Sequence, residues 1–131
     1  MKGGYIHERL LLDRIERLFR ERCIEVEKQV STIKGKRARY ADLVVKIGPH
    51  RLVVEAETSS MRVKGDLEKA NEMSATWLWI VVPNRKVADS VRKQLRTLNV
   101  RETEPWLSIL TLGQALERVT NCYSLFPFSK R

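Results

Sequence analysis

The sequence predicts an α/β fold in which helices cover both faces of a mixed β-sheet, with the element order αβββαβαβα. Three observations carry this prediction. Two apolar segments meet at Gly48, Pro49 and His50, which is typical of an antiparallel hairpin. A continuous apolar run over 77–83 is typical of a strand buried on both faces. Amphipathic helical segments alternate with the later strands, which indicates crossover connections.

The N-terminal half supplies one helix and three strands. Residues 5–22 place apolar side chains such as Leu11 at helical spacing, with Arg and Glu on the other side. Residues 23–33 alternate apolar and polar side chains, which predicts a strand with one wetter face. A basic loop follows, and the hairpin strands 41–47 and 51–58 come after it.

The C-terminal half alternates helices with strands. In chain order we expect a helix at 61–75, a strand at 77–83, a helix at 84–98, a strand at 106–111 and a helix at 112–121. The helix expected at 84–98 is basic and amphipathic, because its apolar residues recur every three or four positions: Val87, Val91, Leu95 and Leu98.

Length and charge limit the classes of function. The chain has 131 residues and no internal repeat or linker, so we expect a single domain over residues 1–131. Its 25 Lys and Arg against 16 Asp and Glu give a net charge of +9, which makes nucleic acid the first partner to consider, with a merely soluble basic protein as the alternative. No transmembrane helix or signal peptide is visible, so we expect a cytoplasmic protein with no membrane partner.

Acidic residues stand in the apolar hairpin. Asp42 lies on its first strand, and Glu55 and Glu57 lie on one face of its second strand. If Lys46 pairs with Arg51 around a four-residue loop, Asp42 faces Glu55; if Gly48 pairs with Arg51 around a two-residue loop, Asp42 faces Glu57. Either even loop brings the three carboxylates to one face, whereas an odd loop separates them.

Three neighbouring carboxylates repel one another in a partly desolvated site, so a positive charge is required. A Mg²⁺ or Mn²⁺ ion is one candidate, because one or two carboxylates with water and substrate phosphate complete its octahedron. The alternative places Glu57 in solvent and Asp42 at a turn, with Lys46 and Arg51 pairing the acids.

These residues resemble the PD-(D/E)xK nuclease superfamily, and within it the archaeal-type Holliday junction resolvases and restriction-endonuclease-like domains. The resemblance extends from the first helix to Pro83 and rests on the element order and on "ADLVV" followed, after a hairpin, by "LVVEAET". It implies a restriction-endonuclease-like fold and a Mg²⁺-dependent nuclease in which Asp42 and Glu55 hold Mg²⁺ or Mn²⁺. It also implies a metal-binding Glu in the first helix, for which Glu8 is the best match and Glu16 a weaker one.

Two positions depart from the family pattern. Ala41 replaces the Pro, and Glu57 occupies the Lys position of the motif. A carboxylate there can orient or deprotonate the attacking water, but it cannot supply the positive charge of a Lys. We expect that charge from the next helix, where Lys64 is the nearest candidate and Lys69 the next. The alternative is a catalytically inactive nuclease fold that serves as a nucleic-acid-binding or accessory subunit.

Further residues are candidates for contacts with the nucleic acid, for which DNA is the expected polymer. The basic loop before the first acid is placed to grip phosphates through Lys34, Lys36, Arg37 and Arg39. Thr58 and Ser59 can donate hydrogen bonds to phosphate, although helix capping by Ser59 or Ser60 is the alternative role. The apolar C-terminal segment "CYSLFPF" predicts either packing onto this domain or a homodimer through that tail.

Overall fold

The predicted element order is confirmed. The computed structural model describes residues 3–31, 40–102 and 106–121, with side chains from residue 8 onward. In chain order the elements are α1 (Gly3–Glu21), β1 (Glu25–Ser31), β2 (Tyr40–Ile47), β3 (His50–Ala56), α2 (Val63–Glu72), β4 (Trp77–Val82), α3 (Arg85–Thr97), β5 (Leu107–Thr111) and α4 (Leu112–Thr120). No helix in these ranges is long and apolar enough to cross a membrane.

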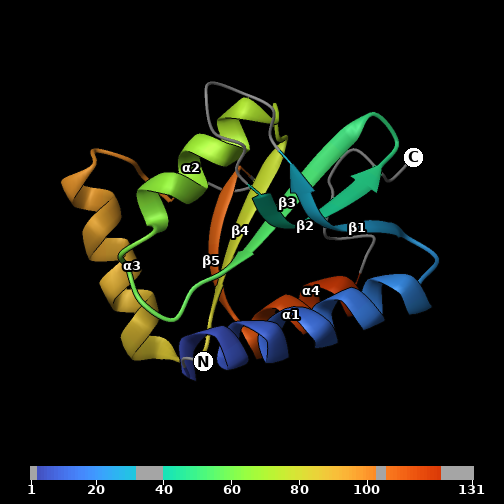
Figure 1. Ribbon diagram of the computed structural model, residues 1–131, viewed down its shortest axis with the longest axis horizontal. Coiled ribbons are helices and arrows are strands. Elements are labelled where there is room, and N and C mark those ends of the chain that lie inside the picture. The colour runs from blue at the N-terminus through green and yellow to red at the C-terminus, as the bar shows by residue number, and fades with distance from the viewer. Residues whose placement is uncertain (1–2, 32–39, 103–105, 122–131) are drawn as a thin grey trace.

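The five strands form one mixed sheet in the order β1-β2-β3-β4-β5, as Figure 1 shows. Strands β1, β2 and β3 are antiparallel neighbours, whereas β3, β4 and β5 run parallel. The parallel strands need crossovers, and α2 and α3 supply them. Because of this arrangement α2 is the next element after β3, which carries Glu55 and has Glu57 just past its last residue.

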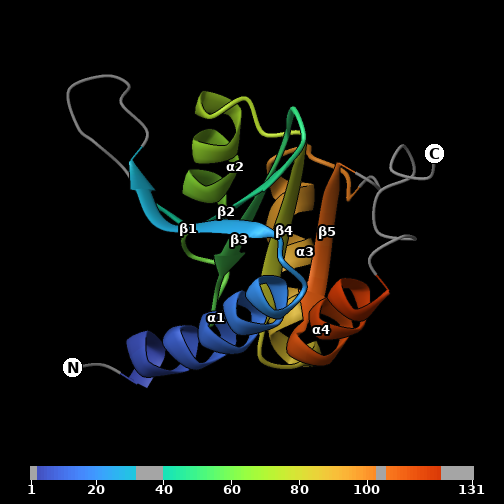
Figure 2. The same cartoon turned by 90° about the vertical axis from the view of Figure 1, so that its right-hand side faces the viewer.

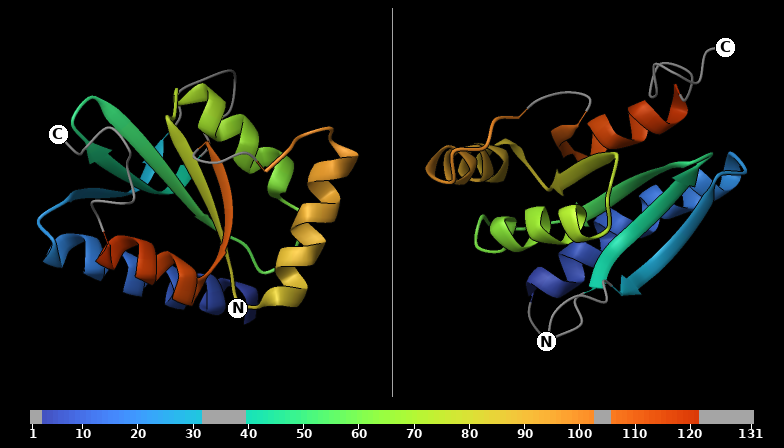
Figure 3. Two further views of the ribbon diagram at one scale, coloured as in Figure 1. Left: turned by 180° about the vertical axis from the view of Figure 1, so that it is seen from behind. Right: turned by 90° about the horizontal axis from the view of Figure 1, so that it is seen from above.

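Helices cover both faces of the sheet (Figures 2 and 3). On one face α1 and α4 pack against the sheet, with Ile15 and Phe19 fully buried and the Phe19 ring 6.1 Å from that of Trp79. On the other face α2 and α3 pack through residues such as Val63 and Val91. The strand over Trp77–Val82 is buried at every position, as its unbroken apolar run predicts.

The hairpin register decides which acids meet. Lys46 pairs with Arg51, so Gly48 and Pro49 form the turn and continuation of the register sets Asp42 opposite Glu55. Gly48 has φ +58°, a left-handed conformation that glycine adopts without strain and that suits the first position of a two-residue hairpin turn. The register is therefore the predicted one with Asp42 opposite Glu55, but the loop has two residues instead of the predicted four, because Ile47 also pairs with His50.

Strand β2 is irregular where it carries the acid. Its pairing with β1 includes Leu43 and Ala41 but omits Asp42, opposite which Gln29 has φ +52°. Its pairing with β3 also ends at Leu43. The interruption on both sides of Asp42 is the kind of local distortion that re-aims a side chain at a functional site.

Candidate active site

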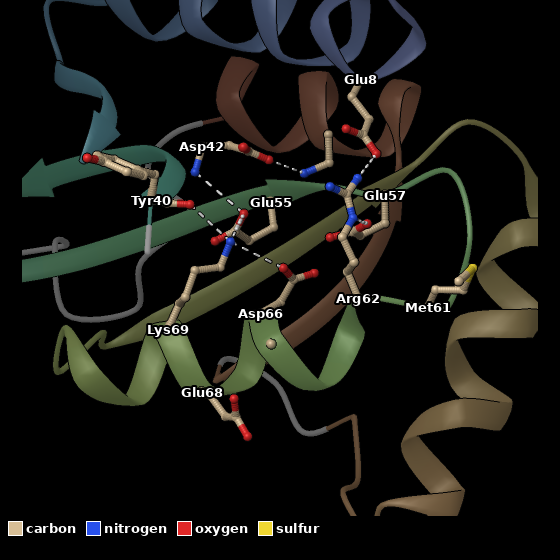
Figure 4. A pocket seen from close by; sticks show the side chains of 12 residues that line it. Glu8, Tyr40, Asp42, Glu55, Glu57, Met61, Arg62, Asp66, Glu68 and Lys69 are labelled. Atoms are coloured by element: carbon tan, nitrogen blue, oxygen red, sulfur yellow. Dashed lines mark hydrogen bonds and ion pairs between the residues drawn. The ribbon is translucent and has the colours of Figure 1, made fainter. Parts of the chain in front are cut away.

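A pocket of about 380 Å³ opens where the irregular part of β2, the end of β3 and the first turns of α2 meet the start of α1. Figure 4 shows the side chains around it. Its lining is dominated by charged groups and consists of Glu8, Tyr40, Asp42, Glu55, Ala56, Glu57, Met61, Arg62, Gly65, Asp66, Glu68 and Lys69. The three acids predicted from the hairpin therefore lie in one pocket, together with the Glu predicted from the first helix.

Asp42 and Glu55 are joined through the backbone of the hairpin. Oδ2 of Asp42 accepts a hydrogen bond from the Ala56 N–H at 3.0 Å, and the N–H of Asp42 lies 3.5 Å from Oε1 of Glu55. These contacts keep the two carboxylates facing each other across β2 and β3, in the register that the turn sets.

Glu55 is 1% exposed, and its Oε2 atom has no hydrogen-bond partner among the residues that the structure describes. Burial raises the pKa of Glu55 well above its usual value, the nearby charge of Asp42 raises it further, and Lys69 opposes both effects. The site is therefore short of positive charge even with one ammonium in contact.

Lys69 supplies that ammonium from α2. Its Nζ lies 3.2 Å from Oε1 of Glu55 and 3.6 Å from Oδ1 of Asp66, and it donates a hydrogen bond to the Tyr40 carbonyl at 3.0 Å. Burial alone lowers the pKa of Lys69, but the neighbouring carboxyl groups of Glu55 and Asp66, with the hydrogen bond to Glu55, outweigh burial and raise it. Lys69 is therefore a charged group at the carboxylates.

Lys64, the nearer of the two predicted lysines, is exposed and does not line the pocket. The expectation of Lys64 at the site is corrected here, because the face of α2 that turns to the sheet carries Asp66 and Lys69, three residues apart, and Lys64 lies on another face. Position in the helix, rather than closeness in sequence to Glu57, decides which lysine reaches the acids.

Glu57 and Glu8 share a different cation. The Arg62 guanidinium lies 2.5 Å from Glu8 Oε2 and 3.5 Å from Glu57 Oε1, so it joins the start of α1 to the end of β3. Glu57 is 3% exposed, and burial raises its pKa while a hydrogen bond with Asp66 and the charge of Arg62 oppose the rise. The acid in the motif Lys position is thus neither in solvent nor unpaired.

Asp66 belongs to the site although sequence reasoning passed over it. It is 1% exposed, and burial together with its hydrogen bond to Glu57 raises its pKa to about 11, so Asp66 carries a proton at neutral pH. The signal was present in the sequence: Arg62, Asp66 and Lys69 are spaced four and three residues apart, which places them on one helix face.

The donor set suits a hard divalent cation. Among the residues that the structure describes, no three His, Cys, Asp or Glu side chains converge as a ready metal site. Two carboxylates are nonetheless enough for Mg²⁺ or Mn²⁺, which keep several waters and bind substrate phosphate. Asp42 and Glu55 provide these two. The buried Oε2 of Glu55, which has no hydrogen-bond partner within the described ranges, is an oxygen of the kind that these ions bind.

Other predicted residues lie elsewhere. Glu16 pairs with Arg20 at 2.9 Å outside the pocket, and Lys46 pairs with Glu27 at 3.2 Å on β1, so Lys46 does not neutralise the hairpin acids. Arg51 likewise turns away, since its guanidinium donates to the Met73 carbonyl.

The segment between β3 and α2 also differs in detail from expectation. Thr58 and Ser59 lie in it and do not line the pocket. Ser59 Oγ accepts from the Met61 N–H at 3.3 Å within the turn, while α2 begins at Val63 with Arg62 as its N-cap and no side-chain capping bond. The capping role predicted for Ser59 or Ser60 is therefore wrong.

Two groups of predicted residues lie outside the described residues. These are the basic loop residues Lys34, Lys36, Arg37 and Arg39, and the C-terminal tail from Cys122 onward, for which the sequence predicts either packing onto this domain or a homodimer.

Comparison with known proteins shows the fold alone. No known family and no curated protein matches the sequence. The structure is similar to the crystal structure of a protein of unknown function, AF1548, with a TM-score of 0.56 and 12% identity over 90% of this chain and 67% of that chain. It is also similar to protein VC1899 from Vibrio cholerae, with a TM-score of 0.52 and 14% identity over 92% of this chain and 33% of that chain. The chain thus spans about a third of the length of VC1899.

Proposed function

We propose that this protein is a metal-dependent nuclease that hydrolyses phosphodiester bonds of nucleic acid, with DNA as the expected polymer. The observation that carries the proposal is the arrangement of Asp42 opposite Glu55 with the Lys69 ammonium 3.2 Å from Glu55. Two carboxylates and a lysine are the groups that the PD-(D/E)xK resemblance requires. Lys69 reaches them from α2 and so offers the charge that Glu57 cannot supply.

Each group has a distinct proposed role. Asp42 and Glu55 would hold Mg²⁺ or Mn²⁺, which when bound would polarise the scissile phosphate and lower the pKa of water. Lys69 would place a positive charge beside the phosphate where negative charge develops. Glu57, hydrogen-bonded to a protonated Asp66, is placed to accept a proton from the attacking water. Glu8, beside Arg62, is the proposed third acid.

A second candidate function is an inactive nuclease fold that binds nucleic acid as an accessory subunit. It is favoured by the ion pairs that occupy the acids: Lys69 contacts Glu55, and Arg62 contacts both Glu8 and Glu57. If these pairs replace the metal ion, the pocket keeps its shape without hydrolysis.

Cleavage assays and metal binding separate the two candidates. Labelled linear, flapped and four-way DNA are incubated with the wild type and with Glu55→Ala in Mg²⁺ and in Mn²⁺. We expect cleavage by the wild type, none by Glu55→Ala and full cleavage by Glu27→Gln, whose carboxylate lies on exposed β1. Titration calorimetry is expected to detect Mn²⁺ binding to the wild type and not to Asp42→Ala.

Two results would count against hydrolysis. Equal cleavage by the wild type and Glu55→Ala would identify a contaminating enzyme. DNA binding without cleavage and without Mn²⁺ heat would favour the accessory subunit.

A further inference from the structure

Exposed apolar side chains gather at the pocket. In the part of the chain that the structure describes, three large apolar residues are strongly exposed: Leu10 at 58%, Tyr40 at 53% and Met61 at 87%. Tyr40 and Met61 line the pocket, and Leu10 does not. A single exposed apolar residue needs no explanation, but two beside one acidic site point to a ligand with apolar surface.

Both residues have a fixed backbone. Tyr40 pairs with Ser31 at the end of β1, and its carbonyl accepts the hydrogen bond from Lys69. Met61 donates its N–H to Ser59, and the next residue, Arg62, is held by its ion pairs with the acids. The exposed side chains are therefore carried by ordered segments, which lowers the entropy cost of using them in binding.

The two side chains bracket the carboxylates. Figure 4 shows Tyr40 at one end of the pocket and Met61 at the other, with Asp42, Glu55 and Glu57 between them. A polynucleotide whose phosphate lies at the carboxylates would place its neighbouring nucleotides at these two ends. A tyrosine ring stacks on any base, and methionine is among the apolar side chains that wedge between bases.

An intact duplex offers such partners only after its base steps are unstacked, which costs free energy. Its bases are stacked inside, so an apolar side chain on the rim would meet phosphates and water. Unpaired bases present exposed faces, and stacking on them removes apolar surface of both partners from water.

We infer that the site takes nucleic acid with unpaired bases beside the scissile phosphate, and that Tyr40 and Met61 stack on the bases on either side. This inference rests on the proposed nuclease function, since that function places a phosphate at Asp42 and Glu55.

Binding is measured apart from cleavage, on the full chain, with Ca²⁺ in place of Mg²⁺. The probes are a fluorescein-labelled blunt DNA duplex and the same duplex with a short single-stranded gap. We expect tighter binding of the gapped probe, and about fivefold or greater loss of that affinity in Tyr40→Ala and in Met61→Ala, since stacking of one base is worth about this much or more. Tyr40→Phe is expected to bind like the wild type, and Leu10→Ala is the matched control.

A 2-aminopurine base in the gap reports stacking directly. We expect its fluorescence to be quenched by the wild type and by Tyr40→Phe, and not by Tyr40→Ala. Thermal unfolding of each variant checks that the fold is intact, which the exposure of both side chains favours.

The outcomes separate this inference from the proposed function. Equal affinity for both probes, with Tyr40→Ala and Met61→Ala behaving like Leu10→Ala, would overturn the inference, while Glu55-dependent cleavage in Mg²⁺ would leave the nuclease proposal standing. Gap-selective binding that depends on Tyr40, without cleavage of any probe, would support base stacking and overturn hydrolysis.

Discussion

The ammonium of Lys69 lies 3.2 Å from Oε1 of Glu55, although the two residues are 14 positions apart in the chain. In the motif that the hairpin resembles, the lysine stands two residues after the acid, on the same strand. Here Glu57 occupies that position, and Lys69 on α2 places a positive charge beside Glu55 on β3. The site thus has an ammonium group beside Glu55 that comes from α2 and not from position 57.

Removal of the Lys69 charge tests whether this lysine takes the role of the lysine that the motif places at position 57. We expect Lys69→Met to lower the rate of DNA cleavage by about 10²-fold or more, since a charge aimed at the reacting phosphate is lost. Lys64→Met removes one charge from an exposed position of the same helix and is expected to cleave normally. Single-turnover cleavage rates compare the three proteins, and equal losses in both variants would contradict the role of Lys69.

Removal of the Arg62 charge is expected to tighten metal binding. Arg62 is paired with Glu8 and Glu57, so Arg62→Gln makes the pocket more negative and should raise the affinity for Mn²⁺ several-fold. The Arg62 side chain is 67% exposed, and we therefore expect a stability loss of no more than about 1 kcal/mol. Calorimetry with Mn²⁺ measures the affinity. Lys93→Gln, at an exposed position of α3, is the control for net charge. Weaker Mn²⁺ binding by Arg62→Gln would show that Arg62 supports the metal site.

Asp66 makes stability depend on pH. Its pKa in the folded protein is about 11, far above the ordinary value of 3.8, so between these values the folded state holds a proton that the unfolded state releases. Stability therefore falls as pH rises through this window, by at most about 1.4 kcal/mol per pH unit. We expect Asp66→Asn to be more stable than the wild type at neutral pH, with a difference that grows toward alkaline pH. Urea unfolding at several pH values measures the free energy of unfolding of both proteins. The same dependence on pH in Asp66→Asn as in the wild type would contradict the prediction.

Glu102 protects the edge of the sheet. Its Oε2 accepts the N–H of Ile109 on β5 at 2.9 Å, and its Oε1 lies 2.7 Å from Nε of Arg92. We expect Glu102→Ala to lose about 1 kcal/mol of stability and to self-associate, because the freed N–H of an edge strand can pair with another chain. Glu102→Gln keeps an acceptor for this N–H and should stay closer to the wild type. Unfolding and sedimentation experiments test both variants, and unchanged association in Glu102→Ala would contradict the protective role.

Much of the fold could be predicted because it depends on local patterns. The apolar run ending at Pro83 and the helical period after it set β4 and α3 to within a residue or two of their predicted bounds. The helix predicted over 61–75 is shorter, at Val63–Glu72, because the chain turns before Val63 and takes a left-handed conformation at Ser74.

The candidate site could be predicted only in part. Asp42, Glu55 and Glu57 stood out because acids in an apolar hairpin are unusual, and Glu8 stood out through its apolar neighbours. The protonated Asp66 did not, because an acid in an amphipathic helix reads as an ordinary surface residue until its burial is known.

The sequence by itself determined the order of elements and the alternation that puts Glu55 and Glu57 on one face of their strand, because strand and helix periods are local properties of the chain. Only the tertiary structure decided that Asp42 faces Glu55, that Lys69 rather than Lys64 reaches them, and that Arg62 holds Glu57. Those contacts depend on how α2 packs against the sheet, and the rotation of a helix about its axis is set by the core it covers.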